Sequence, residues 1–156
     1  DCSLMTVLYR CIRSVHDRSI LQQDIDLLNN PQIWQMQFNV KKCHILCISR
    51  QHAKSIPIYT QGLETLSVVN SFTYIGVTIS SDLRCNEHVA TVVAKASRTL
   101  NFVRRNLYGC TPDVKAKAYQ SLVRPQLEYA VAAWDPYTHK NIQQLESVQH
   151  RGCPFC

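Results

Sequence analysis

The stretch NEHVATVVAKASRTLNFVRRNLY, from Asn86 to Tyr108, decides how the second half of this chain folds. Its apolar residues recur at intervals of four and three positions, which is the spacing of one face of an α-helix. Gly109 suits the end of that helix. Thr111 and Pro112 then predict the start of another helix, as an N-cap residue followed by proline at the first helical position. The apolar face of the first helix comprises Val89, Val93, Ala96, Leu100, Val103 and Leu107.

The rest of the chain is expected to be helical in three segments, the first of which is the helix that Thr111 and Pro112 start. The helix that begins at Pro112 should run until Pro125 kinks or breaks it, and should resume over residues 126–134. A last helix is expected over residues 140–149. The apolar residues assigned to these segments are Val114, Ala118, Leu122, Ile142, Leu145 and Val148.

The first half of the chain has more strand signals. The apolar run at residues 4–9 predicts a buried strand, and Asp17 is a candidate N-cap for a helix that ends before Pro31. Further strands are predicted at 44–49 and 72–79, and a hairpin is predicted around a turn at Gln61-Gly62. The sequence therefore predicts an α+β protein whose halves meet near residues 80–85.

Positive charge is concentrated in the helical half. The whole chain carries a formal net charge of +6, from 17 Lys+Arg and 11 Asp+Glu, which favours polyanionic partners. Between residues 95 and 124 there is one anion, Asp113, and a helical wheel places Phe102 on the cationic face. Such a face can track a phosphate backbone and stack on a sugar or base; the alternative is a solvated surface whose arginine stems cover apolar neighbours. The seven cations are Lys95, Arg98, Arg104, Arg105, Lys115, Lys117 and Arg124.

Several classes of protein and site are not indicated. No apolar run approaches the length of a membrane span, and there is no signal-peptide pattern. The eight cysteines are scattered and are interpreted as reduced thiols of an intracellular protein of the nucleus or cytoplasm. Cys153 and Cys156, with His150, form half of a zinc-ligand set and predict no metal site. We expect no cofactor, no small-molecule substrate and no membrane partner.

Five strings, taken in order, resemble the end of the reverse transcriptase domain in LINE-type (non-LTR) retrotransposons of the jockey-like and chicken-repeat-like kinds. They cover roughly residues 6 to 150 and follow one another at matching spacings. The strings are WQMQFNVKKC at 34–43, YIGVTI at 74–79, KASRTL at 95–100, SLVRPQLEYA at 121–130 and WDPYT at 134–138.

The resemblance implies the C-terminal part of a polymerase palm over residues 1–82, with short antiparallel strands and a helix. It implies an α-helical thumb bundle over 83–150 and leaves 151–156 as a divergent tail. The thumb of this family cradles a template–primer duplex by its backbone, which would give the seven cations an RNA or DNA partner.

Two motifs of the family carry over to numbered residues. Lys42 matches the lysine of the D motif, which lies near the phosphates of the incoming nucleotide and can protonate the leaving pyrophosphate. Tyr74, Ile75 and Gly76 match the E motif, a hairpin that grips the end of the primer. A surface lysine and a glycine bend in a sheet are the simpler interpretations of the same residues.

Catalysis by the family needs two Mg²⁺ ions, held by an early palm carboxylate and by an Asp-Asp turn. In one register the positions of that turn hold Leu4 and Met5. In the other register Asp1 is a remnant of the turn, with extra residues behind it. Neither leaves a catalytic pair, so we expect a fragment of an RNA-directed DNA polymerase that is inactive alone.

Two rival expectations remain beside the polymerase fragment. The chain is alternatively a non-catalytic basic helical module that binds nucleic acid. A third possibility is that it does not fold stably, because a severed palm has an open strand edge and exposed apolar surface.

Overall fold

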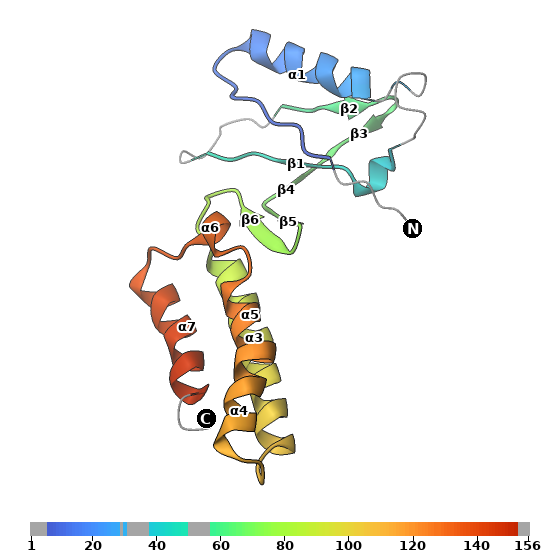
Figure 1. Ribbon diagram of the computed structural model, residues 1–156. Coiled ribbons are helices and arrows are strands. Elements are labelled where there is room, and N and C mark those ends of the chain that lie inside the picture. Colours follow the sequence, from blue (N-terminus) through green and yellow to red (C-terminus); the bar gives the residue numbers. More distant parts are fainter. Residues whose placement is uncertain (1–5, 29, 31–37, 50–56, 153–156) are drawn as a thin grey trace. The chain divides into compact units, whose positions relative to one another are not determined.

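A computed structural model describes residues 6–28, 30, 38–49 and 57–152 (Figure 1). The chain divides into two compact units, Asp1–Val69 and Asn70–Cys156. Small two-stranded sheets are followed by helices, so the α+β class is confirmed. Among the described residues, no helix has both the length and the apolar character that a membrane span requires.

The first unit combines one helix with short strands. Gly62, with φ 64°, lies in the turn between β2 and β3, which pair antiparallel as the sequence predicted. β1 and β4 instead pair parallel, with His44 opposite Ser67, which differs from the short antiparallel strands that the resemblance implied. The elements are α1 (Val15–Leu28), the short 3₁₀ helix η1 (Val40–Lys42), β1 (His44–Leu46), β2 (Thr60–Gln61), β3 (Glu64–Thr65) and β4 (Ser67–Val69).

Helix α1 is joined to β2 by the side chain of Gln22. Its Nε2 donates to the carbonyl oxygen of Thr60 at 2.8 Å, and its Oε1 accepts from the Thr60 backbone N–H at 3.1 Å. One side-chain amide thus satisfies both backbone groups of a strand residue, as a neighbouring strand would do.

Two predictions for the first unit were wrong. Residues 6–9 form no strand and are exposed, with Tyr9 90% accessible, because no strand of the described chain pairs with them. Asp17 is not the N-cap, since α1 already begins at Val15. Ser14 takes that role: its Oγ accepts from the Asp17 N–H at 3.2 Å, and Asp17 Oδ2 accepts from the Ser14 N–H at 2.8 Å. This reciprocal pair is a capping box.

The second unit begins with a hairpin where a single strand over 72–79 was predicted. Strands β5 (Ser71–Tyr74) and β6 (Val77–Ser80) pair antiparallel, with Tyr74 opposite Val77. Ile75 and Gly76 between them have φ values of 45° and 77°. Positive φ at both central residues is the geometry of a type I′ turn, which matches the twist of a tight hairpin. Since the unit starts at Asn70, this hairpin groups with the helices.

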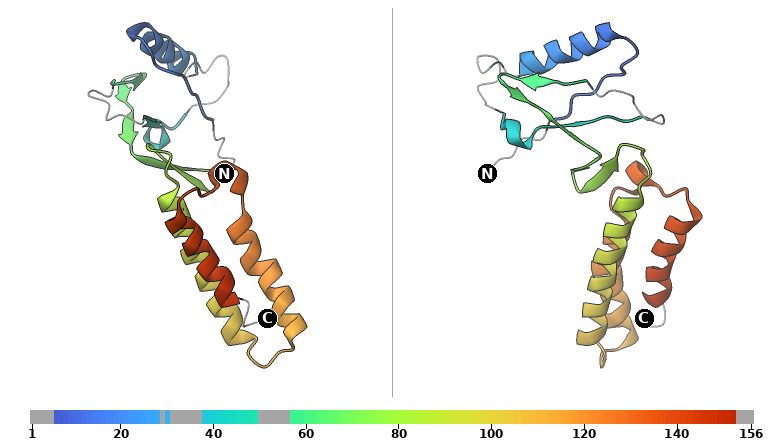
Figure 2. Two further views of the ribbon diagram at one scale, coloured as in Figure 1. Left: turned by 90° about the vertical axis from the view of Figure 1, so that its left-hand side faces the viewer. Right: turned by 180° about the vertical axis from the view of Figure 1, so that it is seen from behind.

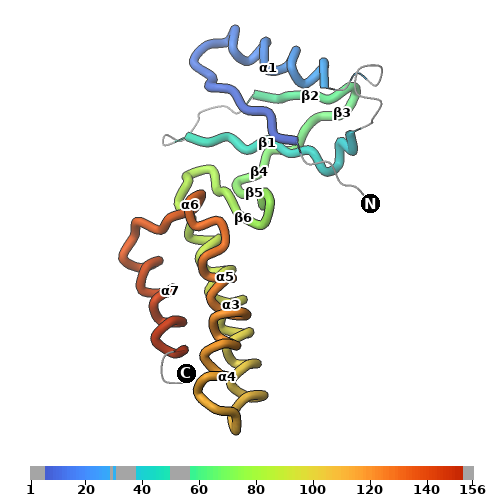
Figure 3. Tube along the Cα trace, in the orientation of Figure 1, coloured from blue at the N-terminus to red at the C-terminus, as the bar shows by residue number. Residues whose placement is uncertain are grey.

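Helices make up the rest of the second unit. Helix α3 (Asn86–Asn106) contacts both α5 and α7, and the elements run side by side in Figure 2 and Figure 3. The expected first helix, the N-cap at Thr111 with Pro112 after it, and the last helix are confirmed. The remaining elements are α4 (Pro112–Ala118), the π-helical segment η2 (Tyr119–Val123), α5 (Arg124–Glu128), α6 (Val131–Trp134) and α7 (His139–Gly152).

The core of this unit lies along α3. Of the predicted apolar face, Val89, Ala96, Leu100 and Val103 are at most 2% exposed. The first core cluster joins α3 to η2, α5 and α7 and comprises Val92, Ala96, Leu100, Val123, Leu127 and Val148. A second cluster comprises Val77, Val89 and Trp134.

The segment before Pro125 departs from the predicted pattern. Val114 and Leu122, which the sequence pattern gave as apolar residues of this helix, are 45% and 48% exposed, while Val123 is fully buried. The π-helical turn of η2 inserts an extra residue into the helix and so rotates the buried face by one position. Pro125 therefore does not end the helix, because the widened turn just before it accommodates a residue without an N–H.

The break occurs later than predicted, after Glu128. Ala130 has φ 52°, which is left-handed and separates α5 from α6, so residues 126–134 do not form one continuous helix.

Candidate nucleic-acid interface

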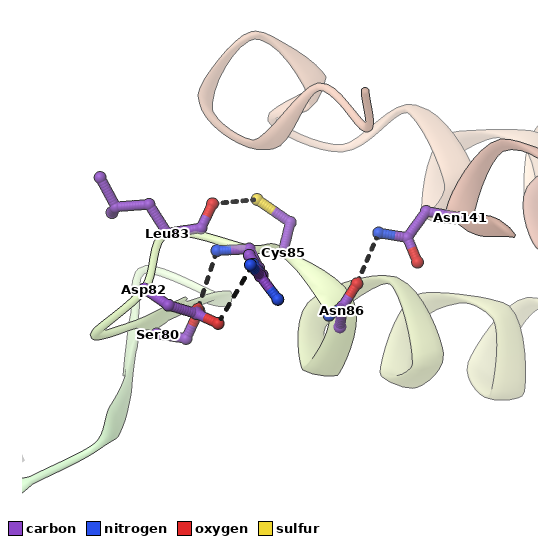
Figure 4. A network of polar contacts seen from close by, with 7 residues as sticks. Ser80, Asp82, Leu83, Cys85, Asn86 and Asn141 are labelled. Atoms are coloured by element: carbon purple, nitrogen blue, oxygen red, sulfur yellow. Dashed lines mark hydrogen bonds and ion pairs between the residues drawn. The ribbon is translucent and has the colours of Figure 1, made fainter. Parts of the chain in front are cut away.

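A network of polar contacts fixes the start of α3 (Figure 4). Asp82 Oδ1 accepts from Ser80 Oγ at 2.7 Å and from the Arg84 N–H at 2.9 Å. These donors lower the pKa of the Asp82 carboxyl group, the backbone N–H of Arg84 most of all. At the first residue of the helix, Asn86 Oδ1 accepts from the buried Asn141 Nδ2 at 2.9 Å. The first turn of α3 is thereby tied to the first turn of α7.

Burial of one face of α3 determines which side chains the helix presents to solvent. Because Leu100 and Val103 point into the core, residues on the opposite side of the helix face outward. Phe102 lies on that outer side and is 57% exposed. Four of the seven predicted cations lie on the exposed surface of this helix: Lys95, Arg98, Arg104 and Arg105.

The outer face of α3 is free of negative charge over a long stretch. No Asp or Glu occurs from residue 88 to residue 112. In the described ranges, none of the four cations of α3 forms an ion pair. Arg98 Nε donates to its own helix, to the carbonyl oxygen of Ala94 at 3.3 Å. The other guanidinium nitrogens of Arg98 remain available to an anion.

A shallow, open hollow lies on this face. It is lined by Arg98, Asn101, Arg104 and Arg105, which follow one another along the helix at intervals of three and one. Three guanidinium groups and one amide supply many N–H donors and one amide oxygen. We call this set, together with Lys95 and Phe102, the α3 basic face.

The remaining predicted cations have different surroundings. Lys117 is exposed on α4 and Lys115 is partly buried. Arg124 Nε lies 2.6 Å from Glu128 Oε1, which raises the pKa of the Arg124 guanidinium and offsets its charge. The sequence carried a signal for this pair that was missed, namely opposite charges four residues apart on a helix.

The hairpin tip at Tyr74, Ile75 and Gly76 is held from within the second unit. Tyr129 Oη donates to the Ile75 carbonyl oxygen at 3.0 Å. A Cβ atom on Gly76 would lie 3.3 Å from Cε1 of the Tyr129 ring, so the ring packs closely over the glycine. Ile75 itself is 61% exposed in a left-handed conformation that β-branched residues rarely adopt.

Other predicted site residues lie in the first unit or outside the described residues. Lys42 is exposed at the end of η1, whose N-cap Asn39 accepts from the Lys41 N–H at 3.1 Å. Asp1, Leu4, Met5 and the Cys153–Cys156 pair lie outside the described residues, as do residues 34–37. In the part of the chain that is described, no three His, Cys, Asp or Glu side chains gather as a metal site would require.

His88 is a polar residue of the core that the sequence did not single out. It is 3% exposed, and its ring meets Trp134 edge to face with centroids 4.8 Å apart. Nδ1 accepts from the Thr78 N–H at 3.2 Å, while Nε2 has no hydrogen-bond partner among the described residues. Burial lowers the pKa of His88.

The indole of Trp134 stabilises the turn between α5 and α6, because its Nε1 donates to the Tyr129 carbonyl oxygen at 2.7 Å.

Comparisons of this chain with models of protein families, with curated proteins and with solved structures found no match.

Proposed function

We propose that the chain is the end of the palm and the thumb of a non-LTR retrotransposon reverse transcriptase, and that the α3 basic face holds the backbone of an RNA or DNA template–primer. Support comes from the five ordered sequence strings and from the placement of the cations on one helix face. The proposal puts the protein in the nucleus or cytoplasm and gives it no catalytic activity on its own.

The observation that carries the binding proposal is the distribution of charge on α3. Lys95 to Arg105 span about 15 Å along the helix axis, since each residue rises about 1.5 Å. A nucleic-acid duplex carries one negative charge per roughly 1.7 Å of its axis, so several phosphates fall within that span. A solvated helix face usually mixes both signs of charge, whereas residues 88–112 contain no carboxylate.

The binding test measures the affinity of the full chain for a fluorescein-labelled RNA–DNA duplex at increasing salt. If four cations each neutralise one phosphate, the slope of log affinity against log salt is about −3.6. Affinity should then fall about 150-fold between roughly 50 and 200 mM salt. An affinity that does not change over this range would rule out a backbone-binding role.

Variants locate the binding surface. Replacing Arg98 and Arg105 by glutamine removes two charges and keeps the helix propensity high, so we expect the salt slope to fall by about 2. The matched control removes two exposed charges elsewhere, with Lys41→Gln and Lys140→Gln. Equal losses in both double variants would show that net charge, not the α3 basic face, governs binding.

Catalysis is tested separately, with primed RNA, Mg²⁺ and deoxynucleotides. We expect no extension, because the positions that match the family's Asp-Asp turn hold no carboxylate pair in either register. Extension by the purified chain would overturn that part of the proposal. Tight, salt-dependent binding without any preference for a primer end would favour the alternative, a non-catalytic basic helical module, which the self-contained core of the second unit also supports.

A further inference from the structure

Phe102 is an exposed aromatic residue in the middle of a cationic surface. The buried apolar residues of α3 are at most 8% exposed, whereas Phe102 is 57% exposed. Arg98 lies one turn before it, and Arg105 lies one turn after it. The Asn106 Nδ2 donates to the Phe102 carbonyl oxygen at 2.8 Å, which holds the backbone of this turn in place. The ring therefore stands on a rigid helix between two guanidinium groups.

Packing within the second unit does not account for this ring. The nearby residues of α3 that face the core, Leu100 and Val103, are already buried. A phenylalanine ring that is 57% exposed gains only part of the stabilisation that burial would give, and phenylalanine has lower helix propensity than arginine. The ring is thus available to a partner that approaches the outer face of α3.

The chemistry of the surface selects the kind of partner. A lipid surface would need a broad apolar helix face toward the membrane, but the apolar face of α3 is buried in the core. A nucleic acid offers both features that the face can recognise, phosphates for the guanidinium groups and flat bases for the ring. In the interior of a paired duplex the base faces are covered by their neighbours, so along a strand it is an unpaired base that can lie on Phe102.

We infer that the α3 basic face is a binding site for a single-stranded nucleotide segment, in which one unpaired base stacks on Phe102 and the flanking phosphates bind Arg98 and Arg105. The hollow lined by Arg98, Asn101, Arg104 and Arg105 receives one of these phosphates. The inference rests on the proposed nucleic-acid binding and specifies its ligand. That ligand is a stretch of unpaired nucleotides, either in a free single strand or next to a duplex.

The experiment compares two single-stranded probes of equal length, oligo(dA) and an abasic oligonucleotide that has the same phosphates without bases. Phe102→Ala should weaken oligo(dA) binding by about 5- to 150-fold, which corresponds to the usual range for loss of one stacked base. The same variant should leave binding of the abasic strand and the salt slope unchanged. Phe102→Trp should bind oligo(dA) at least as tightly as the original chain, while Phe102→Leu, which keeps an apolar side chain without a ring, should behave like the alanine variant.

The outcomes separate this inference from the proposal on which it rests. Unchanged oligo(dA) affinity in Phe102→Ala, or an equal loss on both probes, overturns the stacking site. If Arg98→Gln with Arg105→Gln weakens both probes in that case, nucleic-acid binding by the α3 basic face still stands. If those arginine substitutions leave binding of both probes and of the RNA–DNA duplex unchanged, the proposed function itself fails. Because Phe102 is exposed, circular dichroism should show the same helix content in every variant.

Discussion

The buried imidazole of His88 makes the stability of the second unit depend on pH. Its Nδ1 accepts the Thr78 N–H, so this nitrogen carries no proton and the ring is neutral. Protonation would break that hydrogen bond and leave a positive charge beside the ring of Trp134 in a site that is 3% exposed. The His88 ring therefore binds a proton less tightly in the folded state than in the unfolded chain.

The size of the effect follows from the difference in proton binding. Burial lowers the pKa of His88 in the folded state from the ordinary value of 6.5. The contribution of the neutral His88 ring to the free energy of unfolding is therefore complete above pH 6.5. It is lost as the pH falls from 6.5 toward the lower pKa of the folded state. The loss of unfolding free energy between about pH 7.5 and about pH 5.5 has an upper limit of about 1.4 kcal/mol, one factor of ten in the folding equilibrium, which is reached if the folded ring takes up no proton in that range. That is a large share of the stability of a small domain.

Urea unfolding at several pH values, followed by circular dichroism, measures this loss, and an NMR titration of the His88 ring protons gives its pKa directly. The matched variant is His88→Gln, whose side-chain oxygen can still accept the Thr78 N–H but which does not titrate. We expect the pH-dependent loss to be smaller in the variant by up to about 1.4 kcal/mol. The same loss in both proteins would refute the reasoning, as would a His88 ring that titrates at or above pH 6.5 in the folded chain.

Three other substitutions test the packing and the local geometry by their effect on the free energy of unfolding. Gly152→Ala should cost about 1–3 kcal/mol, because the new Cβ would lie 2.5 Å from Cε2 of Tyr119; an unchanged stability would mean that this ring moves aside freely. Ile75→Asn should stabilise the chain by about 1 kcal/mol, since asparagine tolerates the positive φ of the turn, and a loss of stability would contradict the strained-turn argument. Ser14→Ala should cost about 1 kcal/mol by removing the capping box with Asp17. An unchanged stability would contradict this and would show that the contact of α1 with β2 is enough to hold the helix.

The candidate site was predicted in part from the sequence. A helical wheel places Arg98, Phe102 and Arg105 opposite the apolar stripe of α3, and all three are exposed. The pairing of Arg124 with Glu128 was missed, although opposite charges four residues apart on a helix are a signal for it. It also gave no reason to single out His88, whose surroundings come from β6 and α6, elements separated from it in the sequence.

By itself the sequence determined the helices that depend on neighbours along the chain. The apolar spacing over residues 86–108 predicted α3 to within two residues of its end at Asn106, together with most of its buried face. Thr111 with Pro112 predicted the start of α4, because helical hydrogen bonds and caps are made within a few residues. Only the tertiary structure decided the parallel pairing of β1 with β4, the π-helical turn before Pro125 and the hairpin tip held by Tyr129. Each of these depends on packing or on a partner distant in the sequence, and a pattern of neighbouring residues carries no information about which distant segment supplies it.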